Sequence, residues 1–198
     1  MKNIEIVKRG RPSKVSEVKS FDPSSVKLLR GSELKFNDSL FKPMKTNSEV
    51  DVILSTEGGI MPGTNMVLVG GPGSGKSTVA LDMLSNFTHQ GLKCLFISGE
   101  MDEIAHYKYC KRLPKFACVQ TLFLKNYAET VKETLEYVFA QGYDIIAVDS
   151  IAEVIEMVKD NYKTTESAAE GWFLQLQDSH KKGNNKGSYY TTFINIQQ

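Results

Sequence analysis

The chain has few cysteines, no long apolar run and almost no net charge, and each of these features excludes a class of protein. Cys94, Cys110 and Cys118 show no CxxC spacing, which indicates reduced thiols in a cytosolic protein rather than disulfides or a zinc site. No stretch approaches the ~20 apolar residues that a membrane span needs, and the basic N-terminus lacks the apolar core of a secretory signal. With a formal net charge of +1, any affinity for nucleic acid must come from local patches. The sequence therefore predicts a cytoplasmic protein without a membrane partner.

The 198 residues divide by composition into a tail and a core. Residues 1–50 are rich in Lys, Ser and Pro, and we interpret them as a basic N-terminal tail and entry segment, partly disordered up to about residue 20. Within this tail, residues 8–14 (KRGRPSK) resemble the core of an AT-hook, in which extended arginines enter the minor groove of A·T-rich DNA. A solvated basic tail is the alternative. Residues 51–198 form the predicted core.

From residue 51 onward, short apolar runs alternate with segments of helical periodicity. The runs are continuously apolar, which is typical of strands in a parallel sheet that is covered on both faces. They predict strands over residues 66–69, 94–98, 119–124, 145–149 and 191–196. The segments between them predict helices over residues 77–90, 102–112, 129–140 and 165–181. We therefore predict an α/β fold with a mostly parallel sheet of about five strands and helices on both faces.

A glycine-rich segment after the first predicted strand fits the P-loop pattern G-x-x-x-x-G-K-[ST] at every fixed position. Glycines let the backbone N–H groups turn toward phosphates, and the start of the following helix adds a positive dipole end. Lys76 is then a catalytic residue that faces the β- and γ-phosphates, and the Ser77 hydroxyl binds Mg²⁺. The sequence thus predicts a site for Mg²⁺ and a nucleoside triphosphate, expected to be ATP. The predicted cofactor-binding residues are Gly70, Gly71, Pro72, Gly73, Ser74, Gly75, Lys76, Ser77 and Thr78.

Two acidic residues follow other predicted strands. Asp149 ends the strand 145–149 and is, with Ser77, the predicted metal ligand. Glu100 lies just beyond the strand 94–98, where a parallel sheet presents residues to its ligand, and it could act there as a general base toward water. The residues alone leave an alternative of equal weight, in which Glu100 is one of several acids that a helix dipole stabilises at an N-terminus.

Four segments resemble, in order, the motifs of the RecA-like P-loop ATPases, which include RecA and UvsX, RadA/Sms and the DnaB-type helicase motors. The segments are GGIMPG at 58–63, LFISGE at 95–100, IIAVDSI at 145–151 and FINIQ at 193–197, and the P-loop lies among them. The resemblance covers about residues 51–198 and implies the strand order 1-5-4-2-3. It also implies a DNA-stimulated ATPase of DNA recombination, repair or replication that acts on single-stranded DNA and self-associates as a ring or filament.

The resemblance further implies roles for single residues. Glu100 corresponds to the catalytic base, and Gln197 or Gln198 corresponds to the sensor of the γ-phosphate. An aromatic residue after the catalytic glutamate often stacks on adenine in this family. Tyr107 or Tyr109 could do so, although a place in the core or on the surface of a helix is the alternative.

Several features depart from the relatives. The chain lacks the four-cysteine zinc finger and the protease-like domain of RadA/Sms, and it ends at the sensor strand, so we expect a C-terminally incomplete core. The basic loop over residues 181–187 is either a solvated turn or a surface that faces DNA or another subunit. The strand 66–70 is expected to be an edge, covered by residues 50–60, by a partner chain or by further C-terminal sequence.

Two other functions remain open. A small-molecule P-loop kinase would place the strands 66–70 and 145–149 side by side and would need an arginine-rich lid, but residues 150–190 contain no arginine. A non-catalytic scaffold or assembly protein that senses nucleotide would keep the P-loop without the catalytic step.

Overall fold

The computed structural model describes residues 24, 26–35, 38–181 and 190–197. The chain separates into two compact units, Met1–Lys35 and Phe36–Gln198. Described residues of the first unit include the short 3-10 turn η2 (Gly31–Glu33), and the AT-hook-like residues 8–14 lie outside the described part. The predicted division at residue 50 into a tail and an ATPase core remains a prediction.

The second unit is built on a five-stranded parallel sheet in the order β1-β5-β4-β2-β3. This order and the α/β class confirm the prediction. Because β5 lies between β1 and β4, the arrangement expected for a P-loop kinase is absent from the described sheet. The strands are β1 (Asn65–Val69), β2 (Cys94–Ser98), β3 (Gln120–Phe123), β4 (Ile145–Asp149) and β5 (Thr192–Gln197).

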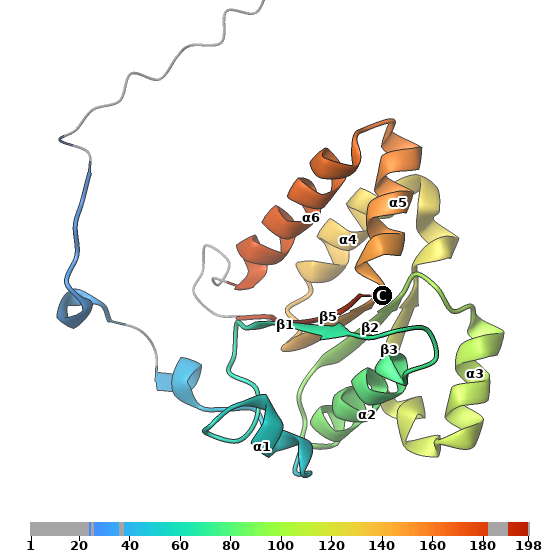
Figure 1. The fold of residues 1–198 in the computed structure, drawn as a ribbon, viewed down its shortest axis with the longest axis horizontal. Helices are drawn as coiled ribbons and strands as arrows, with labels where there is room; N and C mark the ends of the chain where they lie inside the picture. Colours follow the sequence, from blue (N-terminus) through green and yellow to red (C-terminus); the bar gives the residue numbers. More distant parts are fainter. Residues whose placement is uncertain (1–23, 25, 36–37, 182–189, 198) are drawn as a thin grey trace, which may run out of the picture. The chain divides into compact units, whose positions relative to one another are not determined.

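Helices cover both faces of the sheet (Figure 1). The short helix α1 (Val50–Leu54), with α2 (Lys76–His89) and α3 (Glu103–Arg112), lies on one face. There, apolar side chains of α2 join those of the strands in a buried cluster. On the other face, α4 (Val131–Phe139), α5 (Ile151–Tyr162) and α6 (Glu166–Lys181) bury a second cluster around Phe139, Phe173 and Phe193. Short 3-10 segments connect these elements: η3 (Asp38–Phe41), η4 (Pro114–Cys118) and η5 (Leu124–Thr130).

The structure adds one long helix that the sequence analysis does not assign. Helix α5 directly follows Asp149, and Val154 and Val158 on its inner face are completely buried. Their spacing of four residues is helical, but a strand signal that ends only two residues before the helix masks its start. The predicted helix 129–140 also begins later, at Val131, because residues 124–130 form η5. No helix in the described ranges is long and apolar enough to span a membrane.

The strand β1 is an edge of the sheet, as the sequence predicts, and within the described ranges β5 is its single neighbour. Val67 and Val69 point to the face of α5 and α6, yet they are 50% and 72% exposed. Residues 44–60, in contrast, pack on the α2 face through Met44, Val50 and Leu54. The expected cover of the β1 edge is therefore not supplied by residues 50–60.

We predict that Gly59→Ala unfolds the segment before β1. Met44 and Ile60 exchange two backbone hydrogen bonds of 2.8 Å there, and a Cβ at Gly59 would lie 2.4 Å from the Met44 carbonyl oxygen at a φ of +117°. The loss of unfolding free energy in urea should be at least about 2 kcal/mol. The matched variant Gly58→Ala, with φ +71° and no atom within 4 Å, should lose only about 1 kcal/mol. Equal losses in the two variants would contradict the close approach.

Candidate active site

The P-loop connects the end of β1 to the start of α2, as its strand–loop–helix pattern requires. Gly75, at φ 91°, adopts the left-handed conformation that places the loop backbone ahead of the helix N-terminus. The Lys76 ammonium donates hydrogen bonds to the carbonyl oxygens of Gly70, at 2.7 Å, and Gly71, at 3.0 Å. The helix dipole and this ammonium therefore place positive charge in the concave side of the loop, which suits phosphate groups.

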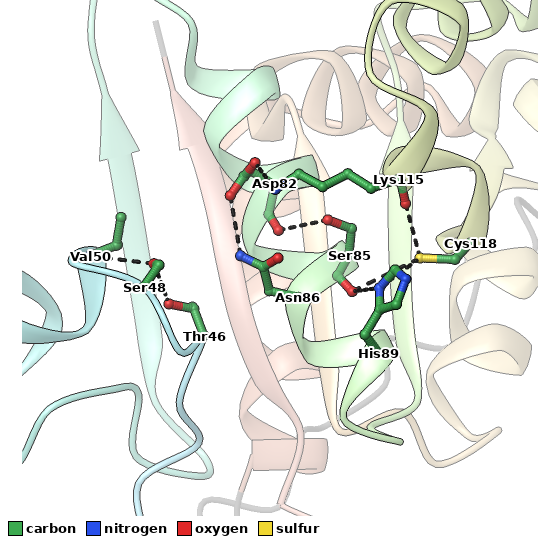
Figure 2. A network of polar contacts seen from close by, with 9 residues as sticks. All are labelled: Thr46, Ser48, Val50, Asp82, Ser85, Asn86, His89, Lys115 and Cys118. Carbon is green, nitrogen blue, oxygen red and sulfur yellow. Dashed lines mark hydrogen bonds and ion pairs between the residues drawn. The ribbon is translucent and has the colours of Figure 1, made fainter.

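Polar contacts join η4 to the middle and the end of α2, the helix that begins at the P-loop (Figure 2). Lys115 pairs with Asp82 at 2.5 Å, and the Cys118 sulfur lies 3.6 Å from His89 Nδ1. His89 Nδ1 also lies 2.6 Å from the Ser85 carbonyl oxygen. Within the described ranges, no group of three His, Cys, Asp or Glu side chains could hold a metal ion, so we treat these contacts as structural.

The two predicted metal ligands lie in direct contact. The Ser77 hydroxyl donates to Asp149 Oδ2 at 2.5 Å, and Asp149 is 2% exposed at the end of β4. Burial is the main cause that raises the pKa of Asp149; the Glu100 carboxylate raises it too, while the bond from Ser77 and the charge of Lys76 oppose the shift. A hydroxyl and a carboxylate beside phosphate oxygens are the oxygen ligands that Mg²⁺ prefers. The residues present therefore fit this ion, which when bound would neutralise phosphate charge.

Glu100 lies next to this pair on a loop that the backbone holds firmly. The N–H groups of Gly99 and Glu100 donate to the Asp149 carbonyl at 2.7 and 3.3 Å, and Lys125 Nζ donates to the Glu100 carbonyl at 3.0 Å. A Cβ at Gly99 would lie 2.8 Å from Glu153 Cβ, so this close approach to α5 favours glycine. The structure thus brings together Glu100, Asp149 and the P-loop, three parts of the chain far apart in sequence.

These residues line one cavity of about 510 Å³, within the range of small-molecule sites. Of the two candidate stacking residues, Tyr109 lines the cavity, whereas Tyr107 is 59% exposed and does not. Sequence reasoning missed Arg112, whose guanidinium carbon lies 5.3 Å from the centre of the Tyr109 ring. The sequence did offer one signal for it: Arg112 follows Tyr109 by three residues, so the two side chains lie on the same face of α3. The described lining residues are Pro72, Gly73, Ser74, Gly75, Lys76, Ser77, Thr78, Glu100, Met101, Ala105, Tyr109, Arg112 and Asp149.

The candidate sensor lies beside this cavity without lining it. Gln197 ends β5, opposite Val69 of β1, and its side chain lines a separate groove on the α5 and α6 face. Gln198 and the loop residues 182–189 lie outside the described ranges. A sensor role for Gln197 therefore stays a prediction that requires its side chain to reach over the end of the sheet.

His106 is the buried side chain of α3. Its ring is nearly buried between Phe96 of β2, at 6.2 Å between ring centres, and Phe123 of β3, at 5.6 Å, and its Nδ1 has no hydrogen-bond partner in the described ranges. Burial lowers the pKa of His106 below that of an ordinary histidine. The unfolded chain therefore takes up the proton first as pH falls below about 6.5, and stability falls with it.

We predict that His106→Phe flattens this pH dependence. The parent should lose thermal stability between about pH 6.5 and pH 5, whereas the variant should lose less over the same interval because it has no imidazole to protonate. Thermal unfolding by circular dichroism across this range measures the difference. Parallel curves for the parent and the variant would show that His106 does not set the slope.

Comparisons with known proteins identify partial relatives and a similar fold. The family model described as "ATPase: KaiC" matches residues 44–115. The DNA repair protein RadA of Campylobacter jejuni is 35% identical over 109 residues, which are 53% of this chain and 22% of RadA. RadA of Listeria monocytogenes is 37% identical over 116 residues, or 57% of this chain and 24% of that protein. RadA of Helicobacter pylori strain J99 is 28% identical over 145 residues, which are 72% of this chain and 29% of that protein.

The matched part of the chain thus spans less than a third of the length of each of these relatives. Among solved structures, the flagellar accessory protein FlaH from Methanocaldococcus jannaschii aligns with a TM-score of 0.52 and 13% identity. The alignment covers 78% of this chain and 70% of FlaH, and at this identity it supports the fold alone.

Proposed function

We propose that this chain, whose fold and motifs resemble those of the RecA-like P-loop ATPases, binds ATP with Mg²⁺ and hydrolyses ATP as the motor of a DNA repair, recombination or replication protein. The observation that carries the proposal is the convergence of Lys76, the Ser77–Asp149 pair and Glu100 on one cavity. The P-loop with Lys76 supplies positive charge for phosphates, and the Ser77 hydroxyl and the Asp149 carboxylate supply oxygen ligands for the metal. Hydrolysis also requires a general base, which Glu100 can provide.

Each residue has a distinct task in this proposal. The P-loop N–H groups and Lys76 bind the β- and γ-phosphates, and Tyr109 offers a ring face for adenine. Ser77 and Asp149 hold Mg²⁺ through oxygen atoms. Glu100 accepts a proton from the attacking water. A role for Gln197 at the γ-phosphate requires its side chain to leave the groove on the α5 and α6 face.

The similarity to DNA repair proteins supports DNA as the macromolecular partner. From the resemblance of the sequence motifs alone, we further propose that this DNA is single-stranded and that the protein self-associates as a ring or filament. We place the protein in the cytoplasm, where the three free thiols at Cys94, Cys110 and Cys118 would stay reduced. A non-catalytic scaffold that only senses nucleotide is the remaining alternative, since it would keep the same cavity.

A nucleotide-binding and hydrolysis assay tests the proposal. Calorimetry should detect binding of ATP that requires Mg²⁺, and phosphate release should rise when a single-stranded oligonucleotide is added. Binding without hydrolysis, under both conditions, would favour the scaffold. Absence of any ATP binding would overturn the whole assignment.

A further inference from the structure

We propose that Lys125 is a positioning residue for the hydrolysis step. Its ammonium holds the peptide group of Glu100, so that the Glu100 carboxylate stays directed into the nucleotide cavity where the attacking water must lie. The inference rests on the proposed function, because it assigns a further residue to the same reaction. It gives a role to the start of η5, a segment that follows β3 and does not line the cavity.

The register of the parallel sheet places Lys125 level with Glu100. Ser98, the last residue of β2, pairs with Phe123, the last residue of β3, and on its other side with Asp149, the last residue of β4. Glu100 and Lys125 each follow the end of their own strand by two residues. Because the carboxyl ends of parallel strands meet at one edge of the sheet, the chain segments that carry these two residues leave the sheet side by side.

The backbone of Glu100 is held from both neighbouring strands. On the β4 side, its N–H donates to the Asp149 carbonyl oxygen at 3.3 Å. On the β3 side, Lys125 Nζ donates to the Glu100 carbonyl oxygen at 3.0 Å. A hydrogen bond at the N–H alone would leave the residue free to rotate about that one contact. The second contact, at the carbonyl, fixes the direction in which the Glu100 side chain leaves the backbone.

The residues on either side of Lys125 keep its ammonium within reach of that carbonyl. Leu124 is completely buried, and Asn126 Nδ2 donates to Glu103 Oε1 at 2.6 Å at the start of α3. Both contacts fix the backbone from which the long lysine side chain extends, which lowers the entropy lost when it holds one position. Within the described ranges Lys125 forms no ion pair that would compete for its ammonium. Its polar contact is therefore the Glu100 carbonyl.

The position of Glu100 bears on the rate and hardly on nucleotide binding. A general base must lie within hydrogen-bond reach of the proton it accepts, and a displacement of about 1 Å can lower a rate about 100-fold. Lys125 does not line the cavity and touches none of the P-loop groups that would bind phosphates. Its loss should therefore lower kcat and leave KM for ATP nearly unchanged.

Steady-state phosphate release with ATP and Mg²⁺ tests this role in the variant Lys125→Met, which keeps most of the aliphatic chain and removes the ammonium. We expect kcat to fall about tenfold while KM stays within about twofold of the parental value. Lys125→Arg, which can still donate to a carbonyl, should recover most of the rate. The control Lys159→Met removes a lysine that pairs with Glu156 at 2.8 Å on α5, away from the cavity, and should keep the parental kcat.

Amide hydrogen exchange tests the contact without catalysis. In Lys125→Met, the amides of Gly99 and Glu100 should exchange about fivefold faster or more than in the parent, while those of Phe96 and Ile97 inside β2 should be unchanged. A parental kcat in Lys125→Met, or equal acceleration at all four amides, would overturn the proposal, since Lys125 would then serve only general stability. A parent that releases no phosphate would refute the proposed function instead, and the exchange rates would still decide whether Lys125 holds the Glu100 segment.

Discussion

Replacement of Lys76 by Ala is expected to weaken the binding of ATP with Mg²⁺ about 100-fold or more, a loss of about 2.7 kcal/mol. The Lys76 ammonium is the one lysine charge that lines the P-loop cavity in the described residues, where it donates to the carbonyls of Gly70 and Gly71. Its removal leaves the β- and γ-phosphates without that opposing charge. Isothermal calorimetry with ATP and Mg²⁺ measures the loss directly.

The control for this variant is Lys45→Ala, which removes an exposed lysine that does not line the cavity. It should bind ATP with the affinity of the parent. Unchanged affinity in Lys76→Ala, with an unchanged circular dichroism spectrum, would refute the P-loop assignment and with it the proposed function.

Glu100→Gln is expected to keep ATP binding but to lower turnover about 100-fold or more, the scale of a lost general base. The amide has nearly the same shape as the carboxylate, so the backbone bonds that fix the loop to Asp149 should persist. Because the change removes only proton acceptance, kcat should fall while KM stays within a few-fold of the parental value. Steady-state phosphate release, with and without single-stranded DNA, separates the two constants.

A matched variant distinguishes catalysis from a simple helix-terminal role. Glu103→Gln removes a neighbouring carboxylate that accepts a hydrogen bond from Asn126 at 2.6 Å and does not line the cavity. It should retain the parental kcat. If Glu100→Gln and Glu103→Gln hydrolyse ATP equally well, Glu100 is an acid that stabilises the start of α3 and another group is the base.

Much of the fold follows from the sequence because its signals are local. The strands coincide with short, mainly apolar runs, and the P-loop is a contiguous pattern between a strand and a helix. Both can therefore be recognised without knowledge of distant contacts. The strand order came from the resemblance to the RecA-like ATPases, and the structure confirms it. The sequence analysis did not predict helix α5, because the helix begins two residues after the end of strand β4 and the strand signal masks its start.

For the candidate site, patterns that are local in the sequence predict only some of the residues. The sequence by itself placed Lys76 and Ser77 in a contiguous P-loop pattern and placed Asp149 and Glu100 just after apolar strands, while it left a catalytic and a helix-terminal role for Glu100 equally open. Only the tertiary structure decided that Tyr109 and not Tyr107 lines the cavity, since residues two apart on a helix point in nearly opposite directions. It likewise brought Arg112 into the cavity, turned Gln197 toward the other face, and placed Lys125 on the Glu100 carbonyl. The positions of these side chains depend on how each helix is rotated about its axis and on which strands are neighbours. Long-range packing fixes both the rotation and the neighbours.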